Sequence, residues 1–250
     1  MNIDVAFTPD EVQALSGKVC IVVDVIRSTS TLQVIFSKNP AKVILTPTVQ
    51  KAMKYAAQQT VHPMLCGERG GVMPEGFDHG NSPREYTDLD LTGRTVVFTS
   101  SNGTRAVADV NLAPYVFLGS FLNAGAVTEA ALSTATTHGL DIVMVCAGRE
   151  ERFAIDDAYC AGFLVSQVMS RIPSDQSFEL GEGGQAALAM YGYYRDPLSL
   201  FRGSGAGKAV LGIGLAEDLP FLLQRDLYPV VPTLLQRESS TARWGFSLLI

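Results

Sequence analysis

Short apolar runs rich in valine and isoleucine alternate along the chain with segments of helical periodicity. The runs predicted as strands are residues 19–23, 43–45, 95–98, 115–118 and 142–146, with a late one at 229–231. The segments predicted as helices are residues 28–36, 49–58, 103–110, 124–136 and 156–170. Most of the strands are continuously apolar, which is typical of strands covered on both faces. The pattern therefore predicts a layered α/β/α fold around a mixed, largely parallel sheet.

The pattern changes in the C-terminal third of the chain. Pro173 and the glycine-rich stretch 181–184 separate short segments of helical character, so residues 172–228 are predicted to form a mainly helical extension. A chain of 250 residues is near the size at which single cores stop growing, so we expect one domain over 1–250 or two tightly joined α/β lobes. The apolar end, residues 248–250, is predicted to pack on the body or on a partner, which favours a homodimer.

The charge balance narrows the classes of ligand. The chain has 19 Lys and Arg against 25 Asp and Glu, a net charge of −6, and its basic residues do not cluster. Proteins that bind nucleic acid broadly need a basic face, so this class is excluded. Charged residues make up only 18% of the chain and hydrophobic residues 47%, which is enough to bury a large core.

Targeting signals and cysteine usage indicate the compartment. The first residues show no basic region followed by an apolar run, so no signal peptide is predicted. No apolar run approaches the roughly 20 residues of a membrane-spanning helix, and no membrane is expected as a partner. Cys20, Cys66, Cys146 and Cys160 are scattered without a C-x-x-C pair, which predicts a cytoplasmic protein with reduced thiols and no zinc site.

Polar residues gather directly after the strand at 19–23. Asp24, Arg27, Ser28 and Thr29 follow this strand and open the helix at 28–36. Ligands of open α/β sheets bind outside the carboxyl ends of the strands, so these residues lie where chemistry is expected. The helix N–H groups and the two hydroxyls can hold an anion. Helix capping alone is the alternative, but it does not require the Asp and the Arg beside the hydroxyls.

The same arrangement follows the strand at 95–98. The polar residues at this second junction are Ser100, Ser101, Asn102, Gly103, Thr104 and Arg105. Phosphate or carboxylate is the expected ligand, because arginine offers a planar fork and the helix end offers oriented donors. An Asn-Gly turn with a serine cap explains this segment taken alone. Two such junctions in one chain favour an oxyanion site.

Acidic residues on other predicted loops indicate a metal. Glu68 and Arg69 lie in one polar cluster, and Arg149 precedes the acidic pair Asp156 and Asp157 in another. Acidic residues in a first helical turn also interact favourably with the helix dipole, which is the simpler explanation of the pair. The hard oxygen ligands that Mg²⁺ prefers are supplied by Asp24, Glu68, Asp156 and Asp157. Phosphoryl transfer uses such a metal with arginines and helix N-termini, and the catalytic candidates are Asp24, Glu68 and Asp156.

Two other site types fit less well. Residues 202–209 resemble a P-loop, but Arg202 replaces its first glycine and Ala209 replaces the Ser or Thr that binds Mg²⁺. A cysteine hydrolase would use Cys66 or Cys146 as nucleophile and His79 as base. A lone buried cysteine is more often a small apolar residue.

Together, the polar clusters resemble the 2-phosphosulfolactate phosphatase family, the ComB-like proteins. In chain order they are VDVIRSTST at 23–31, GERGG at 67–71, FDHGNSP at 77–83, TSSNGTR at 99–105, and CAGR at 146–149 with DDA at 156–158. The resemblance reaches to about residue 170. It implies an Mg²⁺-dependent phosphatase that converts 2-phospho-3-sulfolactate to sulfolactate and phosphate, a step of coenzyme M synthesis. It also implies activity on other phosphorylated 2-hydroxy acids, with Asn81 and Ser82 among the substrate-binding residues.

The implied substrate carries a phosphate, a carboxylate and a sulfonate, and holding it requires several cations. Arg27, Arg69, Arg105 and Arg149 are expected to gather on one rim and to clamp these groups, while Mg²⁺ bridges the phosphate to carboxylates. Two nucleophiles stay open, a water activated by the metal and, in second place, Asp24 itself. A non-catalytic binding protein for a small phosphorylated acid is the alternative, although a pure anion binder would exclude the carboxylates.

Overall fold

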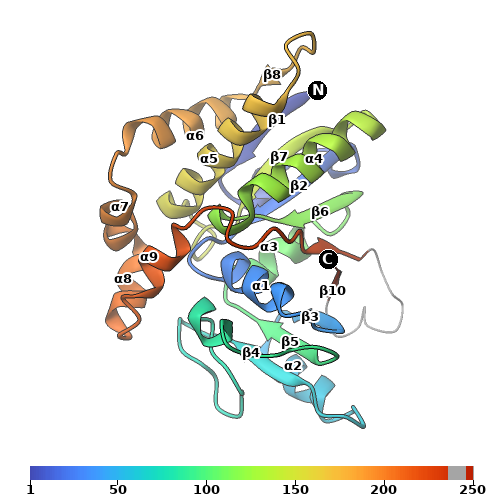
Figure 1. The fold of residues 1–250 in the computed structure, drawn as a ribbon, viewed down its shortest axis with the longest axis vertical. Helices are drawn as coiled ribbons and strands as arrows, with labels where there is room; N and C mark the ends of the chain where they lie inside the picture. Colours follow the sequence, from blue (N-terminus) through green and yellow to red (C-terminus); the bar gives the residue numbers. More distant parts are fainter. Residues whose placement is uncertain (236–245, 250) are drawn as a thin grey trace.

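A ten-stranded mixed sheet forms the centre of the protein (Figure 1). The computed structural model describes residues 1–235 and 246–249. The strands lie in the order β4, β5, β3, β10, β9, β6, β2, β7, β1, β8. Their bounds are β1 Asn2–Ala6, β2 Lys18–Val23, β3 Lys42–Thr46, β4 Met64–Gly67, β5 Thr95–Thr99, β6 Tyr115–Leu118, β7 Asp141–Cys146, β8 Glu179–Leu180, β9 Thr233–Leu234 and β10 Phe246–Leu249.

Two groups of parallel strands make up most of this sheet. One group is β6, β2, β7, β1 and β8, and the other is β3, β5 and β4. Between them lie β9 and β10, which are antiparallel to each other and to the strands they adjoin. The expected mixed, largely parallel sheet is confirmed, and the division of the chain into one domain or two lobes stays a prediction.

Helices cover both faces of the sheet. Their bounds are α1 Ser28–Ser37, α2 Val49–Ala56, α3 Gly103–Asp109, α4 Ala124–His138, α5 Ile155–Arg171, α6 Glu182–Tyr193, α7 Pro197–Gly203, α8 Gly205–Gly212 and α9 Asp218–Leu222. The buried side chains of α4 and α5 share one core with β2 and β7, and those of α1 and α3 share a second core with the opposite face. A smaller core joins α2 to β3, β4 and β5, in the lower half of Figure 1. None of the helices within the described residues is both long and apolar enough to cross a bilayer.

Strand register positions the loops that carry the polar clusters. β2 and β7 pair from Lys18 opposite Asp141 to Val23 opposite Cys146, so the segments that follow them leave the sheet side by side. In the other group, Gly67 lies opposite Thr99. A Cβ on Gly67 would overlap the Thr99 carbonyl, and its φ of +127° also favours glycine. This close approach lets Glu68 N donate to Thr99 O at 2.9 Å.

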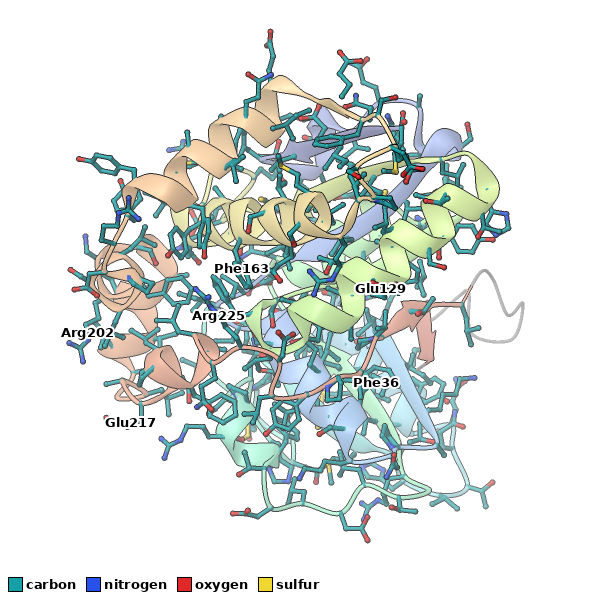
Figure 2. The ribbon with its side chains drawn as sticks, turned by 45° about the horizontal axis from the view of Figure 1, so that its top comes forward. Phe36, Glu129, Phe163, Arg202, Glu217 and Arg225 are labelled. Atoms are coloured by element: carbon teal, nitrogen blue, oxygen red, sulfur yellow. The ribbon has the colours of Figure 1, made fainter. Side chains whose placement is uncertain are left out.

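The predicted helical extension is confirmed in α6 to α9, which follow the short strand β8. α6 packs along α5, and Gly162 in α5 permits this because a Cβ there would overlap the Ala187 carbonyl of α6. α7, α8 and α9 lie together at the left of Figure 1, beside the loops that follow β2 and β7. In Figure 2, Arg225 after α9 reaches back to α5, with its guanidinium 4.5 Å from the centre of the Phe163 ring.

The expected strands from 19–23 to 142–146 are confirmed, but the late strand at 229–231 is wrong. The strand there is β9, Thr233–Leu234. Pro229 and Pro232 explain the shift, because proline has no N–H to donate to a sheet and pairing resumes only beyond it. The apolar end lies on the body as expected, since the backbone of β10 pairs with β3 and β9, whereas Ile250 lies outside the described residues.

Candidate active site

A cavity of about 220 Å³ opens where β2, β4 and β7 end. Its charged walls come from the loops after these strands, with Arg27, Glu68 and Arg149 among them. The opposite wall is Ala206, Ala209 and Val210 of α8. The complete lining is Asp24, Ile26, Arg27, Ser28, Glu68, Gly70, Gly71, Asn81, Ser101, Asn102, Arg149, Glu150, Ala206, Ala209 and Val210.

The structure divides the sequence-predicted site residues into two sets. The set that lines the cavity is Asp24, Arg27, Ser28, Glu68, Asn81, Ser101, Asn102 and Arg149. The set that lies behind the lining or beside it is Thr29, Arg69, Ser82, Ser100, Gly103, Thr104, Arg105, Asp156 and Asp157. Residues of the second set influence the cavity through the residues that line it. Thr29 accepts a hydrogen bond from Asp24 N, and the charge of Asp156 helps to raise the pKa of Asp24.

Asp24 is the buried carboxylate at the centre of this site, with 6% of its surface exposed. Its Oδ2 accepts a hydrogen bond of 2.8 Å from Ser28 Oγ, and its own N–H donates to Thr29 Oγ1 at 3.2 Å. Burial raises the pKa of Asp24 to about 6; the Ser28 hydrogen bond opposes this, and the charges of Glu68 and Asp156 add to it. Gly103 packs on it so closely that a Cβ would lie 2.7 Å from Oδ2.

The acidic pair at the start of α5 has two different environments. Asp157 accepts hydrogen bonds from Val25 N at 2.9 Å and Gly148 N at 3.1 Å, so it ties the loop after β2 to the loop after β7. Burial and the charges of Asp156 and Asp24 hold its pKa well above the usual range. Both oxygens of Asp157 therefore make structural contacts. For Asp156, burial raises the pKa to about 6, although hydrogen bonding by Ser204 and the charge of Arg149 oppose this rise.

Glu68 is held by the second junction. Its Oε1 accepts from Ser101 N at 2.6 Å, and its Oε2 accepts from Gly71 N at 2.6 Å and from Ser101 Oγ at 3.0 Å. Behind it, Thr104 N donates to Ser100 Oγ at 3.0 Å. The anion bound to the polar loop before α3 is thus the protein's own carboxylate.

The four arginines expected on one rim have different partners. Arg27 lies 3.0 Å from Asp218 and Arg149 lines the cavity beside Glu150. Arg69 is held by backbone carbonyls, with Nη1 donating to Ser100 O and Nη2 to Pro47 O at 2.5 Å. Arg105 forms a 3.0 Å ion pair with the exposed Glu151. Arg27 and Arg149 are the two that reach the cavity.

Asn81 contributes an unpaired acceptor to the wall. Only 4% of its surface is exposed, and no donor among the described residues reaches its buried Oδ1. Its backbone carbonyl, in contrast, accepts from Thr31 Oγ1 at 2.9 Å, which fixes the residue to α1. Buried acceptors are rarely left without a partner, so this oxygen suits a ligand that brings a donor or a cation.

The donors fit Mg²⁺, although they do not form a complete cage. No group of three His, Cys, Asp or Glu side chains in residues 1–235 and 246–249 is arranged to hold a metal ion. Mg²⁺ is usually held by one or two carboxylates, with substrate oxygens and water completing its shell. The Asp24 carboxylate, which lines the cavity, and the orphaned Asn81 Oδ1 are hard oxygen donors of this kind.

The cysteine alternative gains no support. All four cysteines are buried and free. Burial raises the pKa of the Cys66 thiol to about 12 and holds that of Cys146 well above the usual range. Both thiols stay protonated near neutral pH, whereas a nucleophilic cysteine is a thiolate.

Sequence reasoning missed the contribution of the C-terminal extension. The segment dismissed as an imperfect P-loop forms α8, which begins after Ser204 and lines the cavity. Asp218 was also missed, although it pairs with Arg27 inside the protein. The only sequence signal for either was the run of small residues at 203–207, and Asp218 lacks the strand-end position that marked the other acids.

An α/β sheet whose strand ends present carboxylates and arginines around a small cavity is typical of enzymes that act on small anions. A family model described as 2-phosphosulpholactate phosphatase matches residues 6–237. The chain therefore belongs to this family of phosphoric monoester hydrolases. The match confirms the resemblance carried by the polar clusters and extends it through the helical extension.

Individual relatives agree with this membership. Over 234 residues the chain is 31% identical to the "Probable 2-phosphosulfolactate phosphatase" of Clostridium acetobutylicum, covering 93% of this chain and 97% of that protein. A protein of the same name from Deinococcus radiodurans is 35% identical over 218 residues, or 86% and 87% of the two chains. One from Thermus thermophilus is 35% identical over 219 residues, with the same coverage.

Proposed function

We propose that the protein is an Mg²⁺-dependent phosphatase that hydrolyses 2-phospho-3-sulfolactate, and other phosphorylated 2-hydroxy acids, to the free hydroxy acid and phosphate. Family membership and the names of the relatives support the substrate. The cavity of about 220 Å³ suits a small molecule of this kind. The four buried free thiols fit the cytoplasmic location that we also propose.

The charge of the cavity is the observation that carries the proposal. Its lining holds two guanidinium groups, Arg27 and Arg149, and three carboxyl groups, Asp24, Glu68 and Glu150. This set alone would repel a substrate with several negative charges. A divalent cation reverses the balance, so the mixture of arginines and carboxylates is what a metal-dependent phosphatase needs.

Among the four carboxylates predicted as metal ligands, Asp24 is the best candidate, because it lines the cavity and Asp156 does not. Glu68 and Asp157 already accept hydrogen bonds on both oxygens. Asp24 lines the cavity, and the hydrogen bonds that lower the pKa of its carboxyl come from Ser28. When bound, Mg²⁺ supplies positive charge that stabilises the transferring phosphoryl group and lowers the pKa of water. Asn81 lines the same cavity, and its Oδ1 adds a second oxygen.

The chain's own residues bind the substrate and move protons. Arg27 and Arg149 bind its anionic groups, and the Ser28 hydroxyl holds the Asp24 carboxylate in place. Hydrolysis takes up one water and returns its proton to the leaving oxygen. A carboxylate that holds the metal is ionised, so the group left to accept and release that proton near neutral pH is Asp156, whose pKa burial raises to about 6.

Release of inorganic phosphate from 2-phospho-3-sulfolactate tests the proposal. We expect turnover by the purified protein with Mg²⁺, loss of turnover in excess chelator, and recovery when Mg²⁺ is restored. Activity that persists in chelator would contradict the metal dependence. Absence of release from every phosphorylated 2-hydroxy acid tried, with binding retained, would instead favour the non-catalytic binding protein. Rapid quenching with labelled phosphate then separates direct attack by water from an acyl-phosphate on Asp24.

A further inference from the structure

Asp218 is a buried carboxylate of the C-terminal extension, in contact with a residue of the cavity wall. It is the first residue of α9, and only 1% of its surface is exposed. Its neighbour Glu217 is exposed, and Figure 2 shows this residue at the outer edge of the molecule. Two adjacent acids thus have opposite surroundings, and only Asp218 faces the body of the protein.

The contacts of Asp218 converge on Arg27. Asp218 Oδ2 accepts a 3.0 Å hydrogen bond from Arg27 Nη1, and the Arg27 side chain is only 3% exposed. Its other oxygen, Oδ1, accepts from Ser82 Oγ at 2.6 Å. On the far side of the same guanidinium, Nη2 donates to Gly71 O at 2.9 Å. The guanidinium is therefore held at both terminal nitrogens.

These two contacts leave other N–H donors of the Arg27 guanidinium for a ligand. Arginine carries five N–H donors in a planar fork, and the two contacts above are the ones that Arg27 makes within the described chain. A guanidinium group that is held in place before the anion arrives loses little conformational entropy on binding it. Without Asp218 the buried positive charge would lack its partner, and the side chain would be free to change rotamer.

We propose that Asp218 is a positioning residue that fixes Arg27 for the anionic groups of the substrate. This inference rests on the proposed function, because it assigns Arg27 to substrate binding. It also gives the helical extension a role at the site, since the pair links α9 to the loop after β2, and Ser82 links both to the loop that carries Asn81. The α8 wall of the cavity belongs to the same extension.

The proposal can be separated from a simple charge effect, because the two predict opposite results. Asp218→Asn removes one negative charge near the cavity. If charge alone mattered, an anion would bind the variant more tightly. If Asp218 positions Arg27, the anion binds more weakly because the fork is no longer held. We expect at least a tenfold rise in KM for 2-phospho-3-sulfolactate, with a smaller change in kcat.

The matched control is Glu217→Gln, which removes a negative charge at the adjacent exposed position. Its KM is expected to stay within twofold of the unchanged protein. Asp218→Glu restores the charge on a longer side chain and should recover part of the affinity. Thermal unfolding of each variant, followed by circular dichroism, shows whether it is folded at the assay temperature.

A double-mutant cycle with Arg27→Lys provides the decisive readout. If Asp218 acts through the arginine fork, Asp218→Asn should change KM less than twofold in the Arg27→Lys background. A loss of equal size in both backgrounds, or an unchanged or lower KM in Asp218→Asn alone, overturns the inference. Affinity for inorganic phosphate, measured by calorimetry on the same variants, keeps this result separate from the proposed function. Weaker phosphate binding in Asp218→Asn supports positioning even if the unchanged protein releases no phosphate from the proposed substrate.

Discussion

The two strand-to-helix junctions have similar sequences and different surroundings. Each places hydroxyl side chains and an arginine where a helix begins after a buried strand, after β2 in one case and after β5 in the other. At the first junction Asp24 and Arg27 line the cavity. At the second, Ser101 and Asn102 also line the cavity, but Ser101 donates to Glu68 and Thr104 N donates to Ser100.

The difference shows that a polar strand end can serve a ligand or serve the fold. The second junction supports the site by holding Glu68, whose Oε1 accepts from Ser101 N at 2.6 Å. The first junction keeps a buried carboxyl group, Asp24, whose pKa burial raises to about 6, and it pairs its arginine with a carboxylate from the distant extension. A buried carboxyl group with a raised pKa therefore marks the functional junction better than composition does.

The largest predicted effect is a loss of activity on substitution at the first junction. Asp24→Asn removes the negative charge of the proposed metal ligand and should lower kcat/KM about 1,000-fold, or about 4 kcal/mol of transition-state stabilisation. Steady-state phosphate release measures this loss. Asp10→Asn, at an exposed aspartate of the η1 turn Pro9–Glu11, is the control for the same chemical change. A less than tenfold loss in Asp24→Asn would show that the first junction does not carry the chemistry.

The same variant, Asp24→Asn, is expected to lose activity but to gain stability. The pKa of Asp24 rises from 3.8 to about 6 on folding, so its contribution favours the folded state below pH 3.8 and is lost as pH rises through 6. In chelator at pH 8, Asp24→Asn should therefore be more stable than the unchanged protein, by about 2–3 kcal/mol. Urea unfolding at pH 8 and at pH 4 measures the gap, which should close at the lower pH. A gap independent of pH would indicate that the charge of Asp24 is not the cause.

Much of the fold could be predicted because its local signals are strong. The continuous apolar runs of β2, β5 and β7 and the polar residues directly after them mark strands and loops without knowledge of tertiary structure. β1 was missed because Asn2 and Asp4 interrupt its apolar residues, β4 because its short apolar run ends in Gly67, and β10 because its partners lie far away in the chain. Register across such distances is set by packing that no local pattern carries.

Only those site residues that lie directly after predicted strands could be predicted from the sequence. Asp24, Arg27 and Arg149 directly follow strands, and the cavity includes all three. Asp218 lies 191 positions from the arginine that it contacts, inside a segment with no sign of chemistry. The partners of Arg69 were equally hidden, because they include backbone carbonyls brought near by the pairing of β3 and β5. Residue type at a strand end indicates where chemistry can occur, but the partner decides whether the group is free for it.

The smallest predicted effects come from matched serine variants at the two junctions. Ser100→Ala leaves the buried Thr104 N–H without its acceptor and should lower the free energy of unfolding by about 1 kcal/mol. Ser28→Ala removes the donor that opposes the high pKa of Asp24, so the acid side of the pH–rate profile should move to higher pH. Urea unfolding and pH–rate profiles of both variants test the contrast. Because no hydrogen bond joins Ser100 to Asp24 among the described residues, its variant should keep the profile of the unchanged protein. An equal displacement in both variants would mean that the second junction also faces the reacting groups.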